Sequence, residues 1–353
     1  MQARHMRVKL QYDGEDISEN IAPFLKSFQF KDSVSNEADD IQVTLEDRQE
    51  LWESDWFPTK GSTLKASFIA TNWNGEGDKE YPVGTFEIDE IEISGLPHEV
   101  KIKAVSVPNN NDLRGIQRNK AWENVKISTI AKEIADRAEL KLYLNLHEDA
   151  EIERLEQREE SDLAFLTRVA KEKSYGVRLS DTQLDVYYIP DLDIAEPIAT
   201  IRKKASRISN YSFRSKTRDT YKAAHVRYEN AKKGVLIEYT FNDPDKKAGK
   251  VLEIHKKVAD EAEAEKLAKA ELREKNKDEI TGRISFGGLA RMTENAVSDD
   301  GTGRNLWLAG FTVALSGFHT FDGKYLVTGS SHSLSMSSGY SCSIDIRRCL
   351  NGY

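Results

Sequence analysis

Hydrophobic and polar residues alternate along most of the first hundred positions, which is the pattern of strands that bury one face. The stretch "TLKASF" (63–68) places its apolar side chains on one face, and "GTFEIDEIEIS" (84–94) continues the alternation through a phase slip at Asp89–Glu90. One extra residue in a strand is typical of a β-bulge. With a further alternating run at 99–107, the pattern predicts a small β-barrel over residues 1–107.

A period near 3.6 residues replaces the alternation in the middle of the chain. Apolar residues form one helical stripe within 125–140, and a second stripe follows Ser161–Asp162, a pair suited to begin a helix. Gly176 is expected to end the second helix in left-handed geometry, and the chain is expected to turn back as a hairpin at 180–182. These features predict a mixed α/β domain over 108–200, after the turn-rich boundary "VPNNNDLRG".

Strand patterns return after residue 201 and are interrupted by one strongly charged helix. The helix "ADEAEAEKLAKAELREKNKD" (259–278) has Asp260 and Glu263 in capping-box spacing and a thin stripe of alanine and leucine. Because the stripe lasts too few heptads for a coiled coil, we interpret it as a solvated surface helix packed on one side. The pattern predicts a second β-barrel over 201–353 with an inserted helical segment at about 256–279.

The end of the chain repeats the order of strands in the first barrel. The runs "AGFTVALSGF" (309–318), "DGKYLVTGSSHSLS" (322–335) and "YSCSIDIRR" (340–348) follow the order of "KGSTLKASF", "VGTFEIDEIEIS" and "EVKIKAVS". A common β-meander pattern would give a similar order, whereas duplication would give two equivalent barrels. We favour duplication, and the predicted fold class is mainly β with an α+β insert.

Composition is that of a protein that folds in water. The 353 residues are 39% hydrophobic, no run approaches the ~18 apolar residues of a membrane span, and "MQARHMRVKL" lacks the apolar core of a signal peptide. Synthesis in the cytoplasm is expected. Cys342 and Cys349 would lie roughly 23 Å apart along a strand and on opposite faces, so neither a disulfide between them nor a zinc site is expected.

The chain contains no stretch with the spacing of a known catalytic or metal-binding motif. The nearest approaches are "GSSHS" (329–333) for a nucleophile elbow and "HEDAE" (147–151) for a zinc-binding helix, and neither fits. We interpret His332 as an ordinary strand residue and His147 as part of a solvated loop. A pair such as Asp39–Asp40 does not define a glycosidase dyad without geometry. The sequence predicts no enzyme activity, no cofactor and no metal.

Charge is distributed unevenly along the chain, whose net formal charge is -8. Residues 36–55 hold eight acidic residues and one basic residue, whereas 202–233 hold eleven basic and two acidic ones. The net charge and the lack of a recognised motif argue against specific nucleic-acid binding. A solvated face and a complementary contact between subunits stay open. For the second of these, the candidate subunit-contact charges are Asp39, Asp40, Glu46, Asp47, Arg202, Lys203, Lys204, Arg214, Lys216 and Arg218.

Several stretches, taken in order, resemble one known family. They are "YDGEDISENI" (12–21), "SVSNEADDIQVTLEDR" (33–48), "FPTKGSTL" (57–64), "VGTFEIDEIEISGLP" (83–97), "ESDLAFLTRVAKEKSYGVRL" (160–179) and the C-terminal "GFHTFDGKYLVTGSSHSLS" to "YSCSIDIRRCLNGY" (317–353). Over nearly its whole length the chain resembles the late control D family, the baseplate hub proteins of contractile phage tails and phage-tail-like bacteriocins.

The resemblance implies a structural role. Hubs of this family are trimers in which two tube-like barrels per chain form a ring of six, so that a six-fold tail tube can sit on a three-fold central spike. It implies contacts with the spike, the tail tube or tube-initiator protein, baseplate wedge proteins and the tape-measure protein. It also implies synthesis in the bacterial host and assembly into the baseplate of a virion or tail-like particle.

Three features bear on this interpretation. The ending "RRCLNGY" resembles the natural end of the family, without the appended lysozyme or spike domain of some relatives. The polar stretch 286–307 is longer than the family leads us to expect and is interpreted as a protruding loop. The alternatives are a spike hub of a type VI-like secretion apparatus and a peptidoglycan hydrolase.

Overall fold

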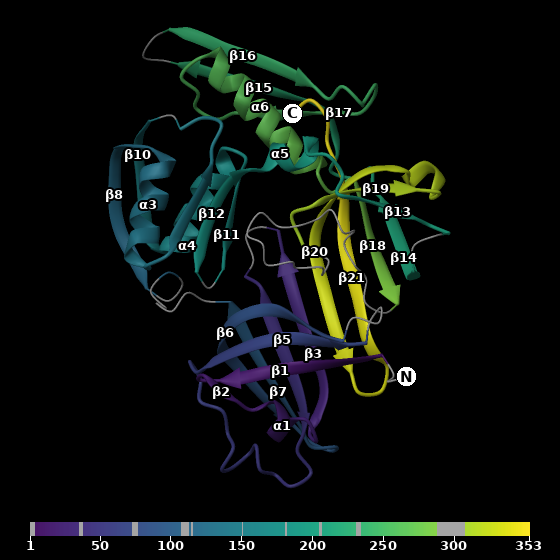
Figure 1. Ribbon diagram of the computed structural model, residues 1–353. Coiled ribbons are helices and arrows are strands. Elements are labelled where there is room, and N and C mark those ends of the chain that lie inside the picture. The colour runs from purple at the N-terminus through teal and green to yellow at the C-terminus, as the bar shows by residue number, and fades with distance from the viewer. Residues whose placement is uncertain are drawn as a thin grey trace.

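Most strands of the chain belong to one sheet that runs across the molecule (Figure 1). The computed structural model describes residues 4–34, 38–72, 77–106, 113, 116–149, 151–180, 182–204, 207–230, 234–287 and 308–353. Within them, thirteen strands are hydrogen-bonded into this sheet. It is made of an N-terminal β-unit, residues 5–106, and a C-terminal β-unit, residues 199–216 and 280–348.

The bounds of the elements in the two β-units are as follows. The N-terminal β-unit holds β1 (His5–Tyr12), β2 (Glu15–Asp16), the short helix α1 (Ser18–Ile21), β3 (Leu25–Ser33), β4 (Asp40–Glu46), β5 (Thr63–Thr71), β6 (Asp78–Ser94) and β7 (Glu99–Ser106). The C-terminal β-unit holds β13 (Ala199–Arg202), β14 (Ile208–Ser215), β18 (Ile280–Gly287), β19 (Thr312–Ser316), the 3-10 turn η2 (His319–Phe321), β20 (Gly323–Ser335) and β21 (Gly339–Arg348).

The two β-units have the same strand order. In the N-terminal β-unit the order is β3-β4-β7-β6-β5-β1, and in the C-terminal β-unit it is β14-β18-β21-β20-β19-β13. Neighbours in both runs are antiparallel, except that β13 and β19 are parallel where β1 and β5 are antiparallel. The repeated order of strands predicted from the sequence is therefore confirmed.

Irregularities in the two units also coincide. The register of β6 against β7 shifts between Ile88 and Glu90, which confirms the bulge predicted from the phase slip at Asp89–Glu90. The register of β20 against β21 shifts between Val327 and Gly329, at the same point of the equivalent strand. A common meander pattern does not require bulges at matching positions, so this coincidence supports duplication.

One hydrophobic core fills both β-units and the seam between them. Residues Gly329–Ser335 of β20 pair antiparallel with Ser27–Ser33 of β3, which joins the C-terminal β-unit to the N-terminal one. Phe28, Phe68 and Ile344 are fully buried in the same cluster. Burial of apolar surface contributes about 25 cal/mol per Å², so a shared core holds the two units together as one folded body.

A mixed α/β domain connects the two β-units. Its elements are β8 (Gln117–Val125), α3 (Ile127–Arg137), β9 (Lys141–Asn145), β10 (Ile152–Ser161), α4 (Asp162–Glu172), β11 (Tyr175–Leu179), β12 (Gln183–Tyr188) and α5 (Ile189–Ile194). β8 pairs with β10, and β12 lies between β11 and β9 in a three-stranded sheet. The apolar stripes of α3 and α4 are buried against these strands, as the helical periodicity predicted. Ser161 begins α4, where its hydroxyl accepts a hydrogen bond from Ala164 N at 3.3 Å.

Helix α4 ends earlier than the sequence indicated. The helix ends at Glu172 with Lys173 as its C-cap, and the next residue, Ser174, takes the left-handed conformation with φ +63°. Gly176 lies inside β11, so the prediction that it ends the helix in left-handed geometry is wrong. A Cβ at Gly176 would approach the ring of Tyr187 to 2.7 Å, so close cross-strand packing is the reason for glycine here. The predicted hairpin after Leu179 is confirmed by the antiparallel pairing of β11 with β12.

An insertion between β14 and β18 is larger than the sequence indicated. β15 (Tyr221–Asn230) pairs antiparallel with β16 (Val235–Asn242) and parallel with β17 (Lys250–Ile254), and α6 (Glu261–Asn276) packs on this sheet. The prediction that residues 201–255 belong to the second barrel, with only a helical segment inserted at about 256–279, is wrong for 221–254. Their alternating side chains are buried in a separate core with α6.

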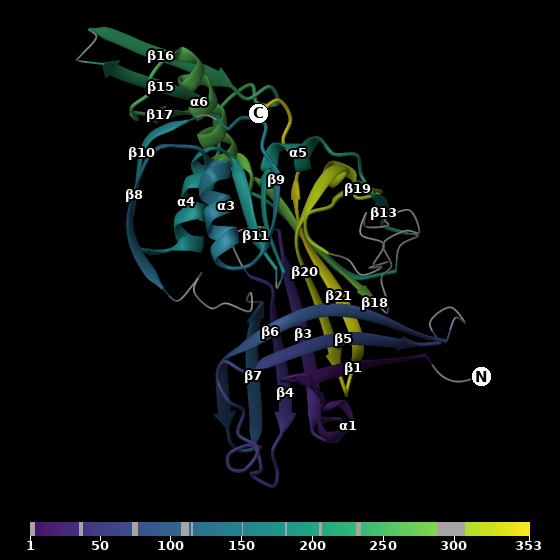
Figure 2. The same cartoon turned by 60° about the vertical axis from the view of Figure 1, so that its left-hand side comes forward.

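Helix α6 itself matches its prediction. Asp260 begins it and accepts a hydrogen bond from Glu263 N at 2.8 Å, and Ala264, Ala268 and Leu272 are buried. Figure 2 shows the insertion and the mixed domain side by side at one end of the sheet, with the N-terminal β-unit at the other. The mainly β fold class is confirmed. The domain limits 1–107, 108–200 and 201–353 stay a prediction, and the proposed loop at 286–307 lies outside the described residues from position 288 onward.

Candidate functional site

The seam between the two β-units is buried and aromatic. His332 of β20 is fully buried, its ring stacks on Phe30 of β3 at 5.9 Å, and its Nδ1 lies 2.6 Å from the hydroxyl of Tyr340. Burial raises the pKa of the Tyr340 phenol well above its usual range, so this hydroxyl stays protonated. His332 therefore has a packing role in the seam, in agreement with its interpretation as a strand residue outside any nucleophile motif.

A buried ion cluster fixes the mixed domain to the N-terminal β-unit. The guanidinium of Arg178 on β11 donates to the carboxylate of Asp32 on β3 and lies 3.4 Å from Asp39. Asp32 is 1% exposed and also accepts a hydrogen bond from the amide of Ala309 at 2.5 Å. Burial raises the pKa of Asp32 to about 7, against the opposing attraction of Arg178. Segments from three parts of the chain thus meet at one carboxylate.

A second buried ion cluster fixes the mixed domain to the insertion and the C-terminal β-unit. Asp193 on α5 accepts hydrogen bonds from Arg273 of α6 at 2.5 Å and from Arg347 of β21 at 2.7 Å. The three side chains are 2%, 5% and 6% exposed. Removal from water makes an isolated charge very unfavourable, so a buried aspartate between two arginines strongly fixes their geometry. Burial also lowers the pKa of the Arg273 guanidinium.

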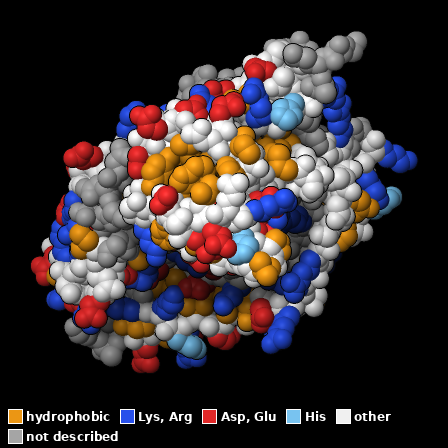
Figure 3. All heavy atoms as spheres, turned by 90° about the horizontal axis from the view of Figure 1, so that it is seen from below, with side chains coloured by type: hydrophobic (Ala, Val, Ile, Leu, Met, Phe, Trp, Pro, Cys, Tyr) orange, Lys and Arg blue, Asp and Glu red, His pale blue; other side chains and the backbone are white. Residues whose placement is uncertain are grey.

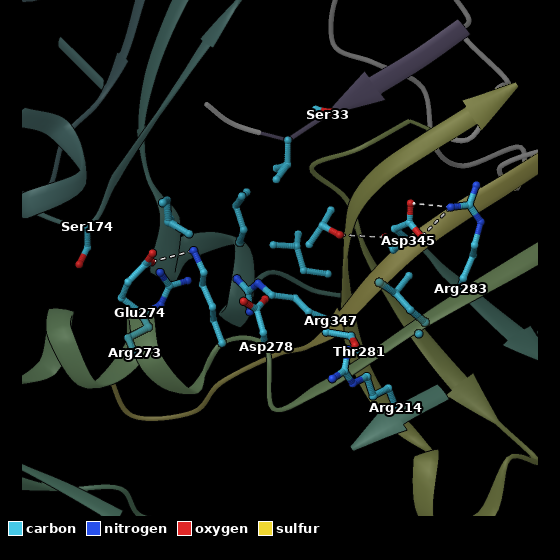
Figure 4. Close-up of a pocket in the computed structure, with 18 of the residues that line it drawn as sticks. Ser33, Ser174, Arg214, Arg273, Glu274, Asp278, Thr281, Arg283, Asp345 and Arg347 are labelled. Atoms are coloured by element: carbon cyan, nitrogen blue, oxygen red, sulfur yellow. Dashed lines mark hydrogen bonds and ion pairs between the residues drawn. The ribbon is translucent and has the colours of Figure 1, made fainter. Parts of the chain in front are cut away.

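A cleft of about 740 Å³ lies where these parts of the chain converge (Figure 4). Most charged groups on its wall are already paired: Lys171 lies 3.0 Å and Lys277 lies 2.8 Å from Glu274, and Arg283 lies 3.4 Å from Asp345. The lining also includes Ser33, Ser174, Arg214, Arg273, Asp278, Thr281 and Arg347. Among the described residues, no group of three His, Cys, Asp or Glu side chains could hold a metal ion. These ion pairs hold the parts of the chain together around a cleft whose wall is both polar and apolar.

The acidic candidates for subunit contact mostly have partners within the chain. Asp39 belongs to the Arg178 cluster, and Glu46 lies 2.8 Å from Arg48. Asp47 is 1% exposed and accepts hydrogen bonds from the amides of the following loop. Asp40 is half-buried at the start of β4.

The basic candidates lie at the surface. Arg202, Lys203 and Lys204 are exposed at the end of β13 and just after it. Arg214 is exposed on β14, half-buried Lys216 follows that strand, and Arg218 is almost wholly exposed. The basic candidates are therefore exposed or half-buried at the surface, whereas Asp39 and Asp47 have partners within the chain. Their role in a contact between subunits stays a prediction.

An exposed aromatic cluster that the sequence reasoning did not identify follows β4. Trp56 and Phe57 are 44% and 49% exposed, and the ring of Trp56 lies 5.6 Å from Trp52 and 5.8 Å from Phe24. Figure 3 shows the molecule from below, and on the face seen in that view hydrophobic side chains gather among charged ones. The sequence "LWESDWF" carries three aromatic residues in seven positions, which is the signal that could have found the cluster.

No helix among the described residues is both long enough and apolar enough to cross a membrane.

Two curated proteins have sequences similar to this chain. The "Probable baseplate hub protein" of Escherichia phage 186 is 30% identical over 166 residues, and that of Escherichia phage P2 is 31% identical over 166 residues. Each match covers 46% of this chain, and 39% and 40% of the two relatives. The chain thus spans about two fifths of the length of the relatives it matches. None of the protein-family models compared with the chain matches it.

Solved structures share the fold over nearly the whole chain. The 43 kDa tail protein of prophage MuSo2 from Shewanella oneidensis has a TM-score of 0.72 and 13% identity, covering 97% of this chain and 98% of its own. An E. coli component of the type VI secretion system, described as structurally similar to the T4 bacteriophage tail proteins gp27 and gp5, has a TM-score of 0.54 and 15% identity, covering 92% of this chain and 73% of its own. The resemblance to baseplate hub proteins predicted from the sequence is confirmed by these relatives.

Proposed function

We propose that this protein is the structural hub of a contractile-tail baseplate. The observation that carries the proposal is the presence of two β-units with the same strand order in one chain, joined edge to edge through β20 and β3. The similarity to baseplate hub proteins of two phages supports the same function. Because the two β-units of a chain are alike, each chain offers two similar surfaces. A partner ring made of identical subunits could bind one subunit at each of these surfaces.

The hub acts as a homotrimer in this proposal. Three chains carry six β-units, so a ring of three presents nearly six-fold symmetry to a hexameric tail tube and three-fold symmetry to a central spike. The ring surrounds the central channel. Its partners are the spike protein, the tube or tube-initiator protein, the wedge proteins and the tape-measure protein, and its location is the baseplate of a virion or tail-like particle.

The test is the copy number and symmetry of the full chain when it is co-expressed with the spike protein of the same genome. Mass photometry is expected to give three copies of the chain per complex, and cryo-electron microscopy a ring of six β-units. A complex with one, two or four copies of the chain, or a chain that stays monomeric beside its spike, contradicts the proposal.

A second candidate is a spike hub of a type VI-like secretion apparatus, which the shared fold with the E. coli component favours. The same co-expression experiment distinguishes the two candidates if the tube and spike proteins come once from the tail operon and once from a secretion operon. A peptidoglycan hydrolase is the third candidate, and a zymogram of the purified chain on peptidoglycan tests it. Clearing that a single carboxylate substitution abolishes would establish the hydrolase.

A further inference from the structure

The seam inside the chain shows how one β-unit adds to another. In that seam, the C-terminal half of β20 pairs antiparallel with β3. By strand order, β20 corresponds to β6 and β3 corresponds to β14. The seam therefore joins the β6-type strand of one unit to the β3-type strand of the next. Within the chain, β20 and β3 already form one such joint. If two copies of the chain are joined in the same way, β6 of one copy pairs with β14 of the other.

Both of those strands have an unpaired edge. β6 pairs with β5 as far as Glu87, and the backbone of the next residue, Ile88, is hydrogen-bonded to Gly61 and Ser62. Within the described part of the chain, the last residues of β6, from Glu90 to Ser94, pair with β7 on one side and with no strand on the other. β14 pairs with β18 and ends the sheet, with no strand on its other side among the described residues. Figure 1 shows β6 and β14 on opposite sides of the molecule. A second molecule could therefore continue the sheet at either edge, because unpaired backbone groups accept a further strand.

The registers of the two units fix which residues would face one another. The matching bulges align Ile88 of β6 with Val327 of β20, so Glu92 and Ser94 correspond to Ser331 and Ser333. On the other side, β3 and β14 each have a register shift between their first paired residue and the residue two positions later, which are Leu25 and Ser27 in β3 and Ile208 and Asn210 in β14. This aligns Leu25 with Ile208, Gln29 with Ser212 and Lys31 with Arg214.

We propose that β6 of one copy pairs antiparallel with β14 of a neighbouring copy, with Ser94 opposite Ser212. This register is that of Ser333 opposite Gln29 in the seam within the chain. It places Glu92 opposite Arg214 and Glu90 opposite Lys216. The proposal deepens the hub function proposed above and rests on it for the number of copies in the ring.

The side chains at these positions suit the pairing. Glu90, Glu92 and Arg214 are exposed, and opposite charges directly across an antiparallel pair stabilise it. On the other face, Ile93 is 38% exposed and would lie opposite Phe213, which already contacts Phe321 at 4.8 Å in a stacked pair. Pairing would thus remove exposed apolar surface on one face and match charges on the other.

The glutamates of β6 have partners within the chain that do not block the contact. Glu90 lies 2.7 Å from Lys103 and Glu92 lies 3.2 Å from Lys101, both on the neighbouring β7. A glutamate on a sheet surface can lie between cations on both neighbouring strands. The arrangement across β7, β6 and β14 would alternate cation, anion and cation.

Disulfide crosslinking tests the register. The full chain with Ser94→Cys and Ser212→Cys, oxidised at high concentration with copper phenanthroline, is expected to give species of two and three chain masses on a non-reducing gel. The native Cys342 and Cys349 are buried, with thiol pKa values raised by burial, so they stay unreacted. Gln29→Cys with Ser333→Cys is the positive control and is expected to link within one chain.

The negative control is Glu90→Cys with Asn210→Cys, two positions that the proposed register holds roughly 20 Å apart along the strands. Crosslinking of this pair, or absence of any crosslink between Ser94→Cys and Ser212→Cys, overturns the proposed pairing. Trimers that form without the Ser94–Ser212 crosslink leave the hub function standing and refute the pairing. Crosslinked species that contain more than three copies of the chain refute the trimer and leave the pairing standing.

Discussion

Gly84 and Gly323 occupy the same position in the two β-units and have nearly the same backbone conformation. Gly84 has φ +140° and lies opposite Ala66, and Gly323 has φ +138° and lies opposite Leu315. Each glycine lies two residues before its strand begins to pair with the last strand of the unit, which is β7 for Gly84 in β6 and β21 for Gly323 in β20. A φ in this range is rarely adopted by any residue with a Cβ, so the duplicated geometry depends on glycine at both positions.

Substitution of either glycine is expected to destabilise its unit. Gly84→Ala or Gly323→Ala should lower the free energy of unfolding by about 1–3 kcal/mol, because alanine must adopt a strained φ. The space around both positions is sufficient, since the nearest atoms to an added Cβ lie 3.6 and 4.0 Å away. Urea unfolding followed by tryptophan fluorescence measures the effect. Gly287→Ala is the control, because a Cβ there meets open space, and equal losses at all three positions would contradict the prediction.

Removal of the buried carboxylate at Asp193 is expected to be strongly destabilising. Asp193→Asn leaves the guanidinium groups of Arg273 and Arg347 buried without a counter-charge, which should lower the free energy of unfolding by about 3–5 kcal/mol. Asp345→Asn is the matched control, because Asp345 and its partner Arg283 are 47% and 52% exposed and such pairs contribute about 0–1 kcal/mol. Denaturant titration of both variants checks the difference, and similar losses would refute it.

Asp32 is expected to make stability depend on pH. Burial raises its pKa to about 7 in the folded chain, above the ordinary value of 3.8. The folded state therefore holds a proton at Asp32 that the unfolded state releases between about pH 4 and 7. The resulting stabilisation is fully present below pH 4 and is lost as pH rises through 7, by roughly 1.4 kcal/mol per pH unit within that window.

Asp32→Asn removes this titration and isolates it from that of other carboxylates. The difference in unfolding free energy between the wild-type chain and this variant should change between pH 5 and pH 8, with the wild type losing more as pH rises. Chemical denaturation at the two pH values provides the measurement. A difference that is the same at both values would show that Asp32 does not titrate in this window.

The two cysteines are expected to be inert in the folded chain. Both are buried, and burial raises the pKa of Cys349 to about 12 and that of Cys342 further. Only the thiolate attacks a disulfide, so reaction with Ellman's reagent at pH 8 should be very slow in the native chain and should release two equivalents in denaturant. Rapid release of one equivalent under native conditions would contradict the buried position of that cysteine.

Local periodicity accounts for the parts of the fold that the sequence predicted. The stripe Ile127, Ile130 and Ala131 identified α3, because burial of one helical face repeats every 3.6 residues. The phase slip at Asp89–Glu90 identified a bulge, because it changes which face each later side chain occupies. Such signals lie within a few residues of one another, and a sequence displays them directly.

Partners that are distant in sequence account for what the sequence did not predict. Asp193 and Arg347 are 154 positions apart, and nothing local marks either as buried. The alternation of residues 221–254 identified strands, but it did not show that they pair with one another and not with the large sheet. In the same way, the acidic composition of 36–55 did not show that Asp39 and Asp47 have partners inside the chain.

Charge reversal at Arg214 is expected to weaken self-association, because it places two like charges across the proposed β6–β14 contact. Arg214→Glu should raise the apparent dissociation constant of the oligomer by about tenfold or less, since a cross-strand ion pair contributes roughly 0.2–1 kcal/mol and its reversal adds repulsion. Glu92→Arg in the same chain restores the opposite charges and should restore association. Arg218→Glu is the control, because Arg218 is 92% exposed and lies beyond the strand. Sedimentation velocity at low and at 1 M salt measures all four chains, and screening at high salt should reduce the differences between them. If Arg218→Glu weakens association as much as Arg214→Glu, or if Glu92→Arg does not restore it, the charges act through the general field of the basic region and not through a specific cross-strand pair.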